Sequence, residues 1–112
     1  MNLHPAKKVI IYVNEDSKFQ HHLLYQALMK FLLDRGVPGA SAIRCLEGFG
    51  SHRQLHTPKL EALAEHLPIR VEFVDTAERV EALLPELAAM VTDGLISVQD
   101  VFIVRQTVTH GE

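Results

Sequence analysis

Gly48 and Gly50 flank a single aromatic residue, Phe49, and a polar stretch with two histidines and one arginine follows them. Glycine has no side chain to hold the backbone away from a ligand, so such a segment can approach a ligand closely. Binding residues are also concentrated on loops between regular elements. We therefore expect a mobile ligand-binding loop over about residues 48–59, with Phe49 as its hydrophobic anchor or as cover for a flat ring. An ordinary bulge or tight turn would account for the two glycines equally well.

Charged residues at three positions could contribute to the same site. Arg44 and Arg53 lie on either side of the glycines and are the candidates to bind an anionic ligand, although ordinary surface positions explain them equally well. Glu15 follows the first predicted strand, where it could cap the next helix or line a ligand cleft between subunits. We include all three among the candidate ligand-binding residues.

Two histidines of the loop could instead bind a metal ion. His52 and His56 are four residues apart, and on a helix this spacing would place both imidazoles on one face. The segment is expected to be a loop, however, so the spacing fixes no third ligand, for which His66 is the available candidate. A metal site at His52 and His56 is therefore the alternative to binding of an organic anion.

Composition favours a binding protein over an enzyme. The chain of 112 residues has a net charge of −3 and no basic block, which gives no drive toward nucleic acid or an anionic membrane. Its single cysteine, Cys45, cannot form an internal disulfide, as is usual in a reducing cytoplasm. No signal peptide is indicated, and the sequence shows no Ser-His-Asp set, Cys-x-x-Cys pair, phosphate-binding loop or His-Glu-x-x-His motif. We expect a cytoplasmic protein without catalytic activity.

Hydrophobic periodicity predicts four strands and two main helices in the order β-α-β-β-α-β. The strands are expected at residues 8–14, 41–46, 69–75 and 95–104, and Gln99 and Asp100 could interrupt the last of them.

The first helix is expected to begin near Phe19 and to end at Gly36. The second is expected over about residues 76–93, where residues 75–78 resemble a capping arrangement. A kink or restart is expected at Leu84, because Pro85 cannot donate a backbone hydrogen bond. A short helical segment is expected to begin at Thr57.

This order is that of a ferredoxin-like α+β domain, a four-stranded antiparallel sheet with both helices on one face. The other face carries apolar side chains that need cover, so we expect it to be buried between identical subunits. The residues assigned to this open face are Ile10, Tyr12, Val71, Phe73, Val101 and Ile103. We expect one domain over residues 1–112, with an ordered core at about residues 7–105 and a frayed tail at 106–112.

Several short motifs follow one another in a characteristic order. They are Gly36-Val37-Pro38-Gly39-Ala40, Gly48-Phe49-Gly50, His56-Thr57, Leu67-Pro68, the strand at residues 70–74, and Asp93-Gly94-Leu95-Ile96. With this set the chain resembles the PII-like signalling proteins, and most closely their branch called domain-of-unknown-function family 190, over roughly residues 8–105. The resemblance implies a homotrimer with ligand sites in the clefts between subunits.

In PII proteins the Gly-Phe-Gly segment forms the base of a mobile loop and contributes to an adenine-nucleotide site, while the loop tip docks onto transporters or enzymes. The resemblance therefore implies nucleotide contact for Gly48, Phe49 and Gly50, and a membrane transporter or channel as the regulated partner. PII proteins also carry a lysine in the turn before the last strand, which residues 91–95 lack, and only Arg105 follows that strand. Of AMP, ADP and ATP, a nucleotide with few phosphates is therefore the expected ligand.

The divalent-cation-tolerance trimers are distantly similar to the same group of proteins. This distant similarity implies the alternative function, which is metal binding through His52 and His56.

Overall fold

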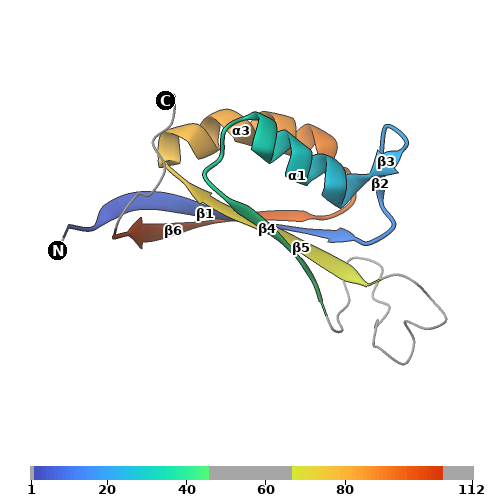
Figure 1. Ribbon diagram of the computed structural model, residues 1–112, viewed down its shortest axis with the longest axis horizontal. Helices are drawn as coiled ribbons and strands as arrows, with labels where there is room; N and C mark the ends of the chain where they lie inside the picture. The colour runs from blue at the N-terminus through green and yellow to red at the C-terminus, as the bar shows by residue number, and fades with distance from the viewer. Residues whose placement is uncertain (1, 46–66, 105–112) are drawn as a thin grey trace.

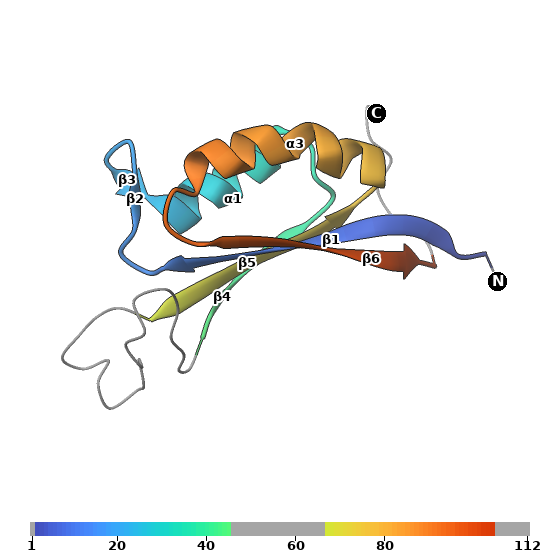
Figure 2. The same cartoon turned by 180° about the vertical axis from the view of Figure 1, so that it is seen from behind.

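The computed structural model describes residues 2–45 and 67–104. Its main sheet has four strands, β1 (His4–Asn14), β4 (Ala40–Arg44), β5 (Pro68–Asp75) and β6 (Leu95–Ile103). All neighbouring strands are antiparallel, and their order across the sheet is β4-β5-β1-β6. Helices α1 (Leu24–Asp34) and α3 (Ala77–Met90) both cover one face of this sheet (Figures 1 and 2). The predicted ferredoxin-like fold is confirmed.

The hydrophobic core lies between the sheet and the two helices. Val9 and Ile11 of β1 pair with Phe73 and Val71 of β5, and all four side chains are buried. Successive residues of a strand point to opposite faces, so these positions share the face under the helices. The assignment of Val71 and Phe73 to the open face was therefore wrong, because they alternate in register with Ile69, which is also buried.

The first helix begins later than its apolar spacing predicted. Phe19 lies not in the helix but in a small hairpin formed by β2 (Lys18–Phe19) and β3 (His22–Leu23). Gln20 and His21 form its two-residue turn with φ angles of 50° and 71°, the left-handed conformation that a type I′ hairpin turn requires at both positions. Phe19 still packs against the core from this hairpin, so the helical spacing was misleading there.

The end of α1 was predicted correctly. Gly36 has a φ angle of 77°, its N–H donates to the Leu33 carbonyl, and the N–H of Val37 donates to the Leu32 carbonyl. These two bonds form a Schellman motif, in which glycine takes up the left-handed conformation that ends the helix.

A buried carboxylate joins the end of β5 to both helices. Asp75 is 3% exposed, and its two oxygens accept hydrogen bonds from the Thr76 N–H and from Arg79 Nε, both at 2.8 Å. The same arginine donates from Nη2 to the carbonyl of Arg35, directly after α1, at 2.6 Å. The Thr76 hydroxyl caps α3 by accepting from the Arg79 N–H, as the sequence predicted. This cluster fixes the two helices and β5 relative to one another.

A restart of the second helix and an interruption of the last strand do not occur. Helix α3 continues through Pro85, which lies on its exposed side next to solvent. Water can reach the backbone there and bind the carbonyl that proline leaves without an N–H partner. Strand β6 also continues through Gln99 and Asp100, because both pair with β1. The helix expected from Thr57 and the tail at 106–112 lie outside the described residues.

Gly94 offers a direct test of the packing between the α3–β6 turn and β1. A Cβ atom at this position would lie 2.4 Å from the Tyr12 carbonyl oxygen, which belongs to the central strand and cannot move aside. We expect Gly94→Ala to lower the free energy of unfolding by about 2 kcal/mol, within the usual range for overpacking. Urea unfolding measures this loss. Gly39→Ala is the control, because within the described residues no atom beyond its chain neighbours lies within 4 Å of its Cβ position, and a loss as large there would contradict the explanation.

The Asp75 cluster gives a second prediction. Arg79→Met keeps the aliphatic stem but removes the charge, leaving the Asp75 carboxylate buried without its guanidinium partner. We expect the free energy of unfolding to fall by roughly 3 kcal/mol, as for other buried pairs that lose one member. Lys30→Met is the matched control, because it breaks the exposed pair with Asp34 on α1. Both variants should be unfolded at one protein concentration, and equal losses would show that the burial of Asp75 is unimportant.

Candidate functional site

The described part of the candidate site lies where β4 ends and β5 begins. Arg44 pairs with Ile69, and the N–H of Cys45 donates to the Pro68 carbonyl at 2.8 Å. Residues 46–66, which contain the predicted loop, therefore leave and rejoin the sheet at neighbouring strand ends. Six of the predicted site residues lie outside the described residues, namely Gly48, Phe49, Gly50, His52, Arg53 and His56.

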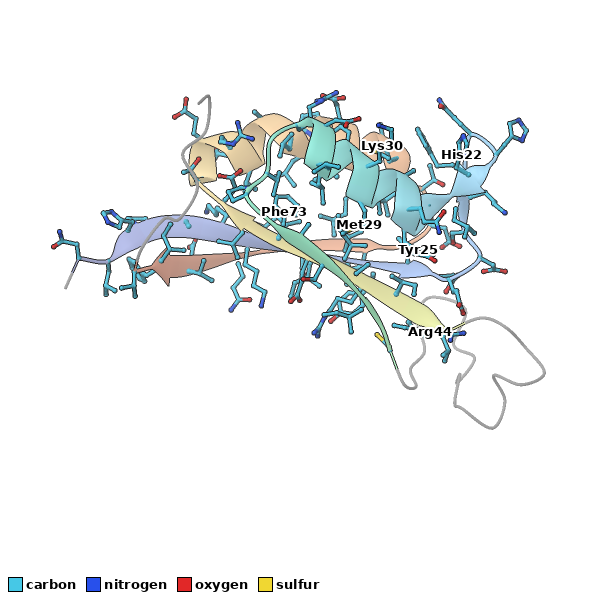
Figure 3. All side chains as sticks on the ribbon, in the orientation of Figure 1. His22, Tyr25, Met29, Lys30, Arg44 and Phe73 are labelled. Carbon is cyan, nitrogen blue, oxygen red and sulfur yellow. The ribbon has the colours of Figure 1, made fainter. Side chains whose placement is uncertain are left out.

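The other two predicted residues, Glu15 and Arg44, contact each other. Arg44 Nη2 lies 2.9 Å from each of the two carboxylate oxygens of Glu15. The Arg44 side chain is 53% exposed and that of Glu15 is 27% exposed, so this ion pair is accessible to solvent. Figure 3 shows Arg44 where β4 ends, away from His22 and Lys30. The structure thus brings together two charged side chains that the sequence indicated as separate candidates.

The backbone of Glu15 makes a further contact at this site. Its N–H donates to the carbonyl of Leu67 at 2.9 Å, directly before β5. Glu15 therefore contacts the chain on both sides of residues 46–66, through its carboxylate at Arg44 and through its backbone at Leu67. The alternative interpretation of Glu15 as a helix cap is wrong, because α1 begins at Leu24 and has no side-chain cap.

Sequence reasoning selected Glu15 and Arg44 but could not predict that they pair. The two residues are 29 positions apart, and their contact depends on the antiparallel register of three strands. Neither residue lies in a motif whose spacing shows this contact.

A groove of about 750 Å³ lies on another part of the surface, between the β2–β3 hairpin and the two helices. Its lining includes Phe19, His22, Lys30, Phe31 and Glu86. Arg35 donates to both carboxylate oxygens of Glu86, and this hydrogen bonding lowers the pKa of the Glu86 carboxyl below its ordinary value. This groove was not predicted from the sequence, because a helix was expected from Phe19 onward, where the structure has the hairpin that forms one wall.

Within residues 2–45 and 67–104, no three His, Cys, Asp or Glu side chains are grouped closely enough to hold a metal ion. No helix in the same part of the chain has the length and apolar character needed to span a membrane.

The model of domain-of-unknown-function family 190, described as "Uncharacterized ACR", matches residues 6–103. The chain belongs to this family. Two curated relatives are UPF0166 proteins. The one from Aquifex aeolicus is 30% identical and covers 93% of this chain and 98% of its own length. The one from Methanocaldococcus jannaschii is 33% identical and covers 85% of this chain and 88% of its own length.

Solved structures show that this family 190 chain has a PII-like fold. A structure of CPII, a nitrogen regulatory PII-like protein from Thiomonas intermedia, has a TM-score of 0.69 at 24% identity and covers 93% of this chain and 92% of its own. That CPII structure is bound to ADP, AMP and bicarbonate. A PII-like signalling protein from Thermus thermophilus has a TM-score of 0.64 at 23% identity, and the match covers 93% of this chain and 94% of that protein's chain. The resemblance found in the sequence is confirmed.

Proposed function

We propose that this protein is a trimeric, cytoplasmic PII-like regulator that binds an adenine nucleotide between subunits. In this proposal Gly48, Phe49 and Gly50 contact the nucleotide, and Arg44, Arg53 and Glu15 line the same site. The segment that follows the glycines transmits ligand occupancy to a partner, a membrane transporter or channel. The protein acts by binding and carries out no reaction.

The observation that carries this proposal is the fold shared with CPII over almost the whole chain, since the CPII structure contains ADP and AMP. The local geometry supports it. The glycines follow Arg44 within six residues, and Arg44 is fixed by its pairing with β5. A nucleotide bound at the glycine backbone would therefore lie close to a cation that can contact its phosphate.

The turn before β6 supports a nucleotide with few phosphates. Residues 91–95 contain no lysine or arginine and carry Asp93. Phosphate sites usually combine backbone donors with a positive side chain, so this turn would not stabilise the γ-phosphate of ATP. AMP and ADP are the ligands that fit this charge distribution better.

The open face of the sheet supports association between subunits. Tyr12 and Ile43 are each 37% exposed there, and they flank Arg70 from the two neighbouring strands. Arg70 Nε lies 3.2 Å from Glu72 Oε2, and within the described residues neither of these buried atoms has a hydrogen bond. The exposed apolar side chains of this face are what a second subunit over it would bury.

Nucleotide binding is tested by thermal and chemical unfolding with AMP, ADP or ATP. A ligand that binds only the folded protein should raise the free energy of unfolding by about 2.7 kcal/mol at one hundred times its Kd. We expect AMP and ADP to stabilise more than ATP at equal concentration. Gly50→Leu should abolish the effect because its side chain would occupy the space of the ligand, whereas the Gly39→Ala control should retain it.

Divalent metal ions belong in the same experiment. Stabilisation by metals alone, lost in the double variant His52→Ala/His56→Ala, would replace the nucleotide proposal with the metal-binding alternative. No response to any nucleotide would reject the proposed ligand class.

The trimer is tested by light scattering after size-exclusion chromatography. The expected mass is three times the 12.6 kDa of the chain. Ile43→Glu should lower the mass or raise the dissociation constant of the oligomer, because it places a charge on the open sheet face. Leu33→Glu is the control, since Leu33 lies on α1 and is 77% exposed. A trimer unaffected by Ile43→Glu would place the subunit interface on another surface.

A further inference from the structure

Glu15 contacts the candidate cation, Arg44, directly. We propose that the Glu15 carboxylate occupies the anion-binding position of Arg44 in the free protein, and that the ligand's anionic group displaces it. Glu15 is then a specificity-determining residue that weakens binding of anionic ligands. This inference rests on the proposed binding of an adenine nucleotide at the same site.

The contact between the two side chains has the geometry that such an exchange needs. Arg44 reaches both Glu15 oxygens through one nitrogen, Nη2, at 2.9 Å. A guanidinium carries five N–H donors and stays charged at physiological pH. Arg44 can therefore change its acceptor without any protonation step. More than half of its side-chain surface is exposed, so an anion can approach it from solvent.

The strength of the pair also favours exchange. Ion pairs with this much exposure contribute little to stability, because water screens them and both side chains lose freedom. A phosphate binds a guanidinium at least as well as a carboxylate does, because it also forms charge-assisted hydrogen bonds with it. A nucleotide phosphate can therefore replace Glu15 without disrupting the fold.

Glu15 cannot move far once it is displaced. Its backbone N–H is bonded to the Leu67 carbonyl at 2.9 Å, which holds the residue beside the end of β4. The carboxylate can therefore move away only by rotation of its own side chain, and like charges at short distance repel each other. The penalty should be greater for ligands with more negative charge and absent for a neutral one.

The test measures Kd by isothermal titration calorimetry for wild type, Glu15→Gln, Arg44→Gln and the double variant, with ADP and with adenosine. Glu15→Gln should tighten ADP binding by about fivefold, the upper end expected for one exposed ion pair. Adenosine affinity should not change, because adenosine carries no anionic group. Arg44→Gln should weaken ADP binding, and adding Glu15→Gln to it should restore much less than fivefold, because the carboxylate then no longer competes with the ligand for Arg44.

Two controls separate this competition from a general effect of charge or folding. Glu86→Gln removes a carboxylate that is also paired with an arginine. Glu86 lies at the groove beside the β2–β3 hairpin, away from the candidate site, so this variant should bind ADP as tightly as wild type does. Glu15→Ala should tighten ADP binding in the same direction as Glu15→Gln. Thermal unfolding of each variant shows whether it is folded, and Glu15→Ala provides the test if Glu15→Gln is not.

Unchanged or weaker ADP binding by folded Glu15 variants would overturn the inference while the proposed function stands. Equal tightening for ADP and adenosine would also overturn it, because the effect would then not depend on ligand charge. A wild-type protein that binds neither ligand would reject the proposed function, and the inference would fail with it.

Discussion

The buried Asp75 carboxylate is the constraint on which the arrangement of the other elements depends. Its oxygens bind the first turn of α3, and Arg79 extends the contact to the carbonyl after α1. A buried charge needs such partners, because an unpaired carboxylate in a protein interior is strongly unfavourable. Asp75 ends β5, and the same strand begins at Pro68 beside the candidate site. The cluster therefore fixes one end of the strand whose other end lies beside the candidate site.

The candidate site combines a fixed frame with an exchangeable contact. Backbone hydrogen bonds from Glu15 to Leu67 and from Cys45 to Pro68 hold three chain segments together. Both bonds join main-chain groups, so they stay in place when the side chains at the site move. The Glu15–Arg44 pair is different, because it is exposed and joins two side chains that can rotate. The contacts between these two side chains can therefore change while the strands keep their register.

The sequence allowed the fold to be predicted well because its signals are local and agree with the packing. Alternation along β5, the Gly36 helix end and the Thr76 cap each depend on a few neighbouring residues. Phe19 was misassigned because helix and hairpin both leave it partly buried against the core. Glu15 and Arg44 were each selected from the sequence as candidate residues, but their contact was not predicted. This contact depends on the register of the strands, which cannot be read from the residues next to Glu15 or Arg44.

The pairing of β4 with β5 has a consequence for how the family can vary. Residues 46–66 connect two strand ends that are already joined by the bond between Cys45 and Pro68. The entropy of closing a connection between fixed ends rises only slowly with its length. Insertions or deletions between these strands would therefore change the free energy of folding little and leave the core unaltered. The connection at this position can therefore change in length while the scaffold is retained.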